Sequence, residues 1–282
     1  MSPRLELPAL LEPYRSELEA RLAPAVRLSR SAEGGNGAAG CRLGGAARVP
    51  PGTQWPRRDG RPLSFVGQLD FAQLAGAHGG ALPELPTEGV LALFYDVQEQ
   101  PWGYSPEHRA GWAVFYTPRA AEAVELEPPA VLTDEARVPE APLVPRSAFT
   151  LPTVYEMSAE LPELEEAEFD AFDEAFRTLQ DSLGAHDNAH QVLGHPWWQQ
   201  SDARVEAQLV SHGLDCGGGW PATPEAEALK PGASAWRLLW QVGSDDELGL
   251  YWGDLGNLYL LIRDEDLAAR RFERAWLILQ CG

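Results

Sequence analysis

The sequence is poor in basic residues and almost without lysine. Of its 282 residues, 22 are Lys or Arg and 42 are Asp or Glu, and Lys230 is the only lysine. The formal net charge is therefore −20 at pH 7. Affinity for nucleic acid or anionic lipid comes mainly from clustered Lys and Arg, so neither nucleic acid nor a membrane is an expected partner.

Cysteines and long hydrophobic runs are scarce as well. Cys41, Cys216 and Cys281 are too few and too widely spaced for a disulfide framework or a zinc knuckle. No segment approaches the roughly 18 consecutive apolar residues of a transmembrane helix. The N-terminal segment lacks the apolar core of a signal peptide. We therefore expect a cytoplasmic protein.

Proline and glycine are abundant, and they separate short runs rich in β-branched and aromatic residues that predict strands. The predicted strands span residues 63–70, 89–96, 111–117, 205–212, 235–243, 248–252, 256–262 and 275–281. Helical spacing of apolar residues predicts an N-terminal helix over 6–23 and a second helix over about 162–183, which is acidic near its start. The proline-rich residues 120–160 are typical of a surface connector.

The two ends of the chain repeat the same order of motifs. The runs SFVGQLD, GVLALFYD and GWAVFY of the first half correspond to RLLWQVG, GNLYLLI and AWLILQ of the second. This alignment places Gln68 with Gln241, Gly89 with Gly256, and Trp112 with Trp276. Such a pattern indicates an internal duplication.

The predicted fold class is mainly β (α+β), with two related antiparallel β units packed together with an N-terminal helix and a central acidic helix. We expect one domain over residues 1–282. Its parts are a first unit at about 63–117, a connector and helix at about 118–184, and a second unit at about 205–281.

Several stretches resemble a known family. They include GGAARVPPGTQWPRRDGRPLSFVGQLDFAQL, HQVLGHP, QVGSDDELGLYWGDLGNLYLLIRDEDLAARRF and the ending WLILQC. These motifs resemble the YwqG-like family, a bacterial domain of unknown function, over nearly the whole chain. The resemblance implies a mainly β fold with added helices and no established activity. Because some members are encoded beside secreted-toxin systems, it also makes an immunity-type or partner-binding role an expectation.

Two buried glutamines are candidates for a site. Gln68 and Gln241 occupy matched positions inside apolar strands, where a buried amide needs partners for both its oxygen and its nitrogen. They either tie the two units together or line a polar cleft between the units with Asp70 and Asp245.

The acids between residues 245 and 254 allow two interpretations. Asp245, Asp246 and Asp254 each lie beside glycines between predicted strands, which is typical of tight turns. The spacing fails the calcium-loop pattern, because Gly256 stands where that loop needs its glutamate. Two turns close in space would instead gather the carboxylates into a functional cluster.

Histidines give a further candidate. His186, His190 and His195 lie within ten residues, so a His190-centred metal site is one hypothesis. The alternative is that His190 and Gln191 hydrogen-bond the backbone of a packed corner.

No cofactor motif is found, and no nucleophile has the sequence context of a catalytic one, so we expect no cofactor. Whether the chain is an enzyme is left open. The first hypothesis is a binding protein that holds a protein partner or a small polar ligand in a cleft between the units. The alternative is a metal-dependent hydrolase that uses Asp245, Asp246 and Asp254 or a metal centred on His190.

Overall fold

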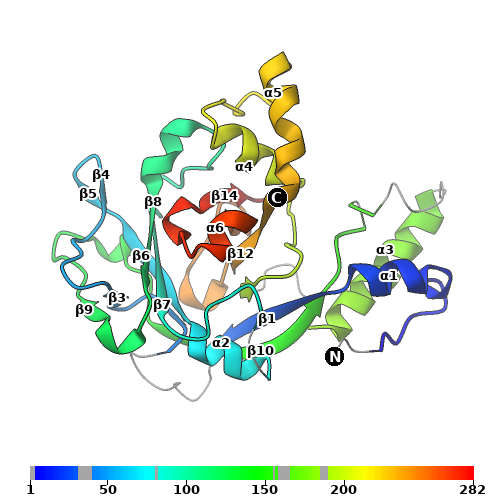
Figure 1. Ribbon diagram of the computed structural model, residues 1–282, viewed down its shortest axis with the longest axis horizontal. Coiled ribbons are helices and arrows are strands. Elements are labelled where there is room, and N and C mark those ends of the chain that lie inside the picture. The colour runs from blue at the N-terminus through cyan, green and yellow to red at the C-terminus, as the bar shows by residue number, and fades with distance from the viewer. Residues whose placement is uncertain (1–3, 31–39, 80–81, 155, 158–165, 185–189) are drawn as a thin grey trace.

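The fold is built on one ten-stranded antiparallel sheet, seen in a computed structural model (Figure 1). The structure describes residues 4–30, 40–79, 82–154, 156–157, 166–184 and 190–282. The sheet has the strand order β14-β13-β12-β11-β1-β10-β2-β6-β7-β8. Its strands are β1 (Ala23–Arg30), β2 (Arg42–Leu43), β6 (Ser64–Asp70), β7 (Val90–Tyr95), β8 (Trp112–Thr117), β10 (Ala141–Thr150), β11 (His190–Val192), β12 (Trp236–Gly243), β13 (Asn257–Arg263) and β14 (Trp276–Gln280). The mainly β fold is thus confirmed.

The sheet curls until its two ends approach each other, which makes it nearly barrel-shaped (Figure 1). The segment just before β8 reaches the free edge of β14, where the backbone N–H of Leu279 donates to the carbonyl of Trp102 at 2.9 Å. Trp276 donates its indole N–H to the Gly103 carbonyl at 2.8 Å. The ring of Trp276 also packs edge-on against Trp112 of β8, with 5.1 Å between ring centroids. These contacts cover backbone that an edge strand would otherwise expose.

Each end of the sheet is a three-stranded meander, and the two meanders share fine details. In β6 the pairing with β7 slips at Val66, and in β12 the pairing with β13 slips at Leu239. Both bulges lie two residues before the strand's glutamine. Three residues after each glutamine, a backbone N–H donates at 3.0 Å to Gly89 in one meander and to Gly256 in the other.

Both glycines are required by a close approach of the third strand. A Cβ built on Gly89 would lie 2.6 Å from the carbonyl oxygen of Thr117. A Cβ built on Gly256 would lie 2.0 Å from the carbonyl oxygen of Gln280. Neither position has room for a side chain, so the matched glycines have the same steric cause.

The matching of the two tryptophans is wrong by one residue. Trp112 pairs with Tyr95, six residues after Gly89, whereas Trp276 pairs with Leu261, five residues after Gly256. A shift of one residue turns a side chain to the other face of its strand. The two rings are therefore neighbours across the closing seam of the sheet rather than equivalent residues of two units.

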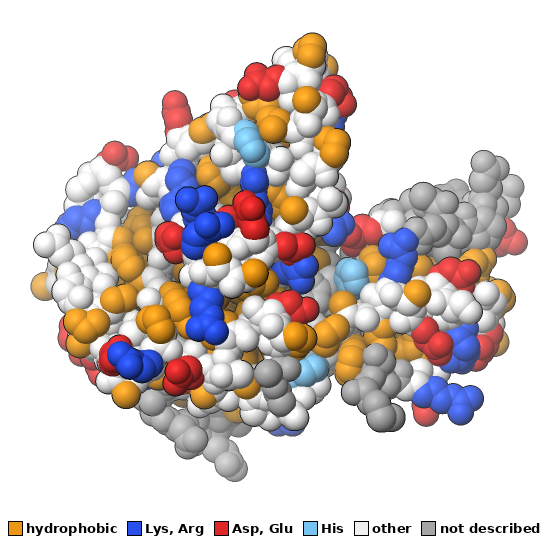
Figure 2. All heavy atoms as spheres, in the orientation of Figure 1, with side chains coloured by type: hydrophobic (Ala, Val, Ile, Leu, Met, Phe, Trp, Pro, Cys, Tyr) orange, Lys and Arg blue, Asp and Glu red, His pale blue; other side chains and the backbone are white. Residues whose placement is uncertain are grey.

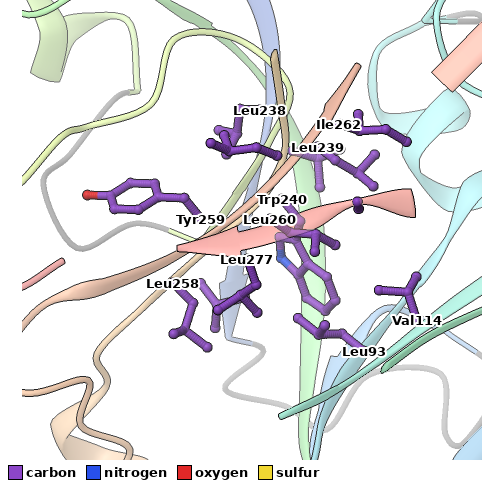
Figure 3. Close-up of a cluster of buried hydrophobic side chains, with 14 of the residues drawn as sticks. Leu93, Val114, Leu238, Leu239, Trp240, Leu258, Tyr259, Leu260, Ile262 and Leu277 are labelled. Carbon is purple, nitrogen blue, oxygen red and sulfur yellow. The ribbon is translucent and has the colours of Figure 1, made fainter. Parts of the chain in front are cut away.

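The main core lies inside the curled sheet and draws on both meanders. Trp240 and Leu260 of the second meander belong to the same buried cluster as Leu93 and Val114 of the first (Figure 3). Strands β6, β7 and β14 are buried along their whole length, and β12 is buried at every residue except Arg237, which explains their nearly continuous apolar sequences. The smaller sheets are β3 (Ala47–Val49) with β9 (Val124–Leu126) and β4 (Arg57–Arg58) with β5 (Arg61–Pro62).

Helices pack around the sheet, and two of them form a separate lobe (Figure 1). The helices are α1 (Arg15–Arg21), α2 (Phe71–Ala77), α3 (Glu166–Ser182), α4 (Arg204–Val210), α5 (Pro224–Leu229) and α6 (Asp264–Ala268). In the lobe, Leu18 of α1 shares a second core with Phe172 and Phe176 of α3. The predicted N-terminal helix is much shorter than expected, because Pro8 and Pro13 cannot occupy a helix interior.

Three further element predictions are wrong. Residues 205–212 form helix α4 rather than a strand, since a short apolar run fits either structure and only its surroundings decide. Residues 248–252 contain no strand, because the chain turns back at Asp245–Leu250. The predicted connector contains β10, a central strand that pairs with β1 along its length despite Pro142 and Pro145.

Candidate functional site

Three charged or titratable side chains from distant parts of the sequence meet at the end of β12. Asp245 follows β12, His190 begins β11 and Arg30 ends β1. The Asp245 carboxylate lies 2.7 Å from Nε of Arg30 and 3.8 Å from Nε2 of His190. His190 accepts a hydrogen bond at Nδ1 from the Gly243 N–H at 3.2 Å, which leaves Nε2 as the protonated nitrogen of the neutral ring.

The Asp245 side chain also shapes its own turn. Its Oδ1 accepts hydrogen bonds from the N–H groups of Glu247 and Leu248, and its backbone pairs with Leu250 in both directions. Gly249 adopts a left-handed conformation, with φ of 61°. The adjacent His190 and the charge of Arg30 lower the pKa of Asp245, although burial opposes the shift.

The other predicted acids do not join Asp245. Asp246 and Asp254 are both exposed, and the Asp254 carbonyl accepts from the Gly282 N–H. Among the residues that the structure describes, no group of three or more His, Cys, Asp and Glu side chains is placed to hold a metal ion. His186 lies outside the described residues. His195 is engaged through Nε2 with the carbonyl of Arg21, and burial lowers its pKa.

The predicted glutamines lie in two separate places, with Gln191 and Gln241 together and Gln68 apart from them. Gln191 and Gln241 face each other on neighbouring strands. Gln241 accepts from the Trp197 N–H at 2.9 Å, while Gln191 donates to the carbonyls of Leu193 and His195. These amides hold the loop that follows β11, as the packed-corner interpretation expects.

Gln68 and Asp70 lie elsewhere, on β6. The Gln68 amide donates to the Gly40 carbonyl at 2.8 Å, and the Asp70 carboxylate caps α2 by accepting from the Gln73 N–H. Strands β2, β10, β1 and β11 separate β6 from β12 in the sheet. The two glutamines therefore belong to different neighbourhoods, each made of backbone groups from its own half of the sheet.

A groove that the sequence did not predict lies between the two meanders. We call it the acidic groove. It has a volume of about 370 Å³ and is lined by Val97 and Gln100 after β7, by Asp134, Glu135 and Arg137–Pro139 before β10 and by Leu248–Tyr251 between β12 and β13. Gln100 bridges its walls, because its amide donates to the Tyr251 carbonyl and accepts from the Gly253 N–H, both at 2.9 Å.

A second groove occupies the corresponding place on the other side of the junction. We call it the arginine groove. It has a volume of about 310 Å³, and its lining includes Pro83–Pro86 before β7, Arg237 of β12, and Asp264, Leu267 and Arg270 after β13. Val97 lies eight residues after Gly89, as Asp264 lies eight after Gly256. In the acidic groove, the segment after β7 meets the segment before β13. In the arginine groove, the segment after β13 meets the segment before β7.

Sequence reasoning missed both grooves because three or more distant segments build each of them. The exposed aromatic ring of Tyr251, 46% accessible, was the one local signal within the acidic groove. The clusters that the sequence did suggest lie beside this groove, since Asp245 fixes the turn that carries Leu248 and Leu250.

Comparison with known proteins identifies a family but no activity. The model of a family described as "Domain of unknown function (DUF1963)" matches residues 41–281, which include both meanders. A comparison with curated proteins finds no match to the chain. Among the described residues, no helix combines the length and apolar character needed to cross a membrane. The chain belongs to the DUF1963 family, a domain of unknown function.

Proposed function

We propose that this protein is a binding protein that holds a positively charged segment of a partner protein in the acidic groove. The observation that carries the proposal is the groove itself, which lies between the two meanders and has acids and an accessible aromatic ring at its surface. The proposed function is binding alone and includes no catalytic step.

We also infer that the two meanders arose by duplication. The inference is supported by the matched bulges at Val66 and Leu239 and by the matched close approaches at Gly89 and Gly256. The order of strands from each edge inward agrees as well, with β8-β7-β6-β2-β10 on one side and β14-β13-β12-β11-β1 on the other. Two duplicated units that pack around a shared axis meet at two equivalent junctions, and each groove lies at one of these junctions.

The charge of the groove favours a basic partner. Asp134 and Glu135 line it and are exposed, and Asp246 adjoins its wall. Arg137, the one base in the lining, lies 3.8 Å from Asp134. The net charge of −20 adds long-range attraction for a basic chain, which raises the rate of encounter.

The shape of the groove is fixed before any partner arrives. Gln100 connects the segment after β7 to the loop after β12 through two hydrogen bonds. Arg30 and His190 hold Asp245, which in turn holds the Leu248 N–H. Binding to such a preformed surface avoids the entropy cost of ordering a loop.

The proposal is tested with a short labelled peptide rich in arginine and leucine, whose binding is followed by fluorescence anisotropy. We expect the double variant Asp134→Asn/Glu135→Gln to bind about 3- to 10-fold more weakly, the range that two exposed charge pairs supply. Tyr251→Ala should weaken binding further, because the ring provides apolar contact area.

The matched control is Asp170→Asn/Glu174→Gln on α3, which removes the same two charges from an exposed surface outside the groove. This control should bind the peptide almost as well as the unaltered protein. If both double variants lose affinity equally, the peptide senses only net charge and the proposal of a groove-bound partner is wrong.

A further inference from the structure

The arginine groove contains a carboxylate whose inner oxygen has no donor within the described part of the chain. Glu84 lies where this groove meets a neighbouring hollow of about 240 Å³, and both are lined by Glu84 and Arg237. The Glu84 Oε1 is 3.8 Å from Nη1 of Arg237, too far for a hydrogen bond. The Glu84 Oε2 is buried and accepts no hydrogen bond from any residue that the structure describes. A buried carboxylate oxygen without a donor is unfavourable, so a ligand that supplies one gains affinity.

The same groove also offers an exposed guanidinium. Arg237 is engaged by the carboxylate of Asp264. Arg270 also lines the groove, is exposed, and contacts the phenol of Tyr116 through its side chain. An arginine with free N–H groups is suited to bind a carboxylate. Figure 2 shows that Lys and Arg side chains gather on the face that carries α6, with acidic side chains between them.

Apolar side chains occupy the rest of the lining. Leu85 and Leu267 are buried in the walls, and Pro83, Pro86 and Ala268 complete them. A volume of about 310 Å³ is at the low end of the range for small-molecule pockets. The groove therefore combines an acceptor for a cation, a donor for an anion and an apolar wall in a space that suits a small molecule.

We propose that the arginine groove binds a small zwitterion of the amino-acid class. Its ammonium group donates to Glu84, its carboxylate accepts from Arg270, and its apolar side chain lies against Leu85 and Leu267. A purely anionic ligand is a poorer fit, because Glu84 and Asp264 balance the nearby arginines. This site is separate from the acidic groove, so either proposal can fail without the other.

Isothermal titration of the full chain with three related compounds tests the proposal. L-leucine carries both charges, isoamylamine lacks the carboxylate, and 4-methylpentanoate lacks the ammonium group. We expect leucine to bind at least about tenfold more tightly than either analogue, because each charged contact contributes about 1.4 kcal/mol or more.

Variants then assign the two contacts. Glu84→Gln should reduce the affinity for leucine about tenfold and leave the affinity for 4-methylpentanoate unchanged. Arg270→Gln should also reduce the affinity for leucine about tenfold, but it should leave the affinity for isoamylamine unchanged. Glu174→Gln, which removes an exposed glutamate on α3 outside the groove lining, is the charge-matched control and should bind leucine normally. The proposal is overturned if leucine shows no saturable binding, if the three compounds bind equally, or if Glu84→Gln and Glu174→Gln behave alike.

Discussion

The two ends of the sheet have the same backbone pattern but different chemistry at their junctions. Both place a bulge before the glutamine and a glycine under the third strand. The loops between their first two strands differ. After β6 the chain forms helix α2, capped by Asp70, whereas after β12 it forms a tight turn held by Asp245. Backbone geometry is thus similar where strands pair and differs where loops meet solvent.

The two grooves show what this difference allows. The acidic groove is lined by a turn that Asp245 fixes and by the exposed Asp134 and Glu135. The arginine groove is lined by α6 and by Arg237 and Arg270. Because loops supply most of the lining, two similar junctions differ in charge and, under our proposals, take different ligands.

Glycine substitutions would have the largest effect and test the equivalence of the two ends most directly. Gly256→Ala forces a Cβ against the Gln280 carbonyl, and Gly89→Ala forces one against the Thr117 carbonyl. We expect each to lower the free energy of unfolding by about 3 kcal/mol, since backbone cannot move aside as a flexible side chain does. Chemical denaturation measures the change.

Gly218→Ala is the control for these substitutions, because a Cβ there meets nothing within 4 Å. It should change the free energy of unfolding by less than about 0.5 kcal/mol. If Gly89→Ala is as harmless as Gly218→Ala while Gly256→Ala is not, the two ends do not share the close approach.

Substitution of the glutamines sharpens the comparison between the two amide sites. Gln241→Leu leaves the Trp197 N–H without its acceptor, and Gln68→Leu leaves the Gly40 carbonyl without a donor. Loss of the partner costs an N–H more than a carbonyl, because an N–H needs an acceptor for its single hydrogen whereas under-satisfied carbonyl oxygens are better tolerated. We expect a loss of about 2 kcal/mol for Gln241→Leu and about 1 kcal/mol for Gln68→Leu, measured by thermal unfolding. Equal losses would contradict this ranking.

The smallest expected effect is on the pH dependence of stability, and it distinguishes two carboxylates in the second half of the chain, Asp245 and Glu206. The pKa of Asp245 is lowered by His190 and Arg30, so its stabilising contribution is present above its ordinary value of 3.8 and is lost as pH falls through the lowered pKa. Burial raises the pKa of Glu206 to about 7, so stability is lost as pH rises from 4.5 toward 7.

The corresponding variants should have opposite pH profiles. Asp245→Asn should cost about 1–2 kcal/mol at neutral pH and progressively less as pH falls through the lowered pKa of Asp245, because the carboxylate then loses its stabilising charge while the Asn variant has no charge to lose. Glu206→Gln should gain about 1–2 kcal/mol at pH 8 and nothing near pH 4. Urea unfolding across this pH range measures both, and a Glu206→Gln gain that does not vary with pH would rule out titration as its cause.

Elements of the fold could be predicted where they depend on residues close together in the sequence, and not where they depend on distant residues. The strands around Gln68 and Gln241 were predictable, because long apolar runs bounded by glycine and proline encode burial locally. Strand β10 was not, since its prolines argue against a strand unless a particular partner tolerates them. Helix α4 was misassigned because a short apolar run does not distinguish helix from strand.

The candidate site shows the same limit. The sequence left Asp245 either as a turn residue or as part of a carboxylate cluster, and nothing local pointed to Arg30, which lies 215 residues earlier and 2.7 Å away. Neither groove was visible in the sequence, because each lining combines segments from both halves of the chain.

The sequence by itself determined the mainly β character, the two glycines and the order of the meander strands, since each follows from hydrophobic pattern and backbone sterics within a few residues. Only the tertiary structure decided the curl of the sheet, the meeting of Trp112 with Trp276 and the positions of the two grooves. The physical reason is that these features depend on which strands lie next to each other, and strand pairing is set by the balance of burial over the whole chain rather than by any single segment.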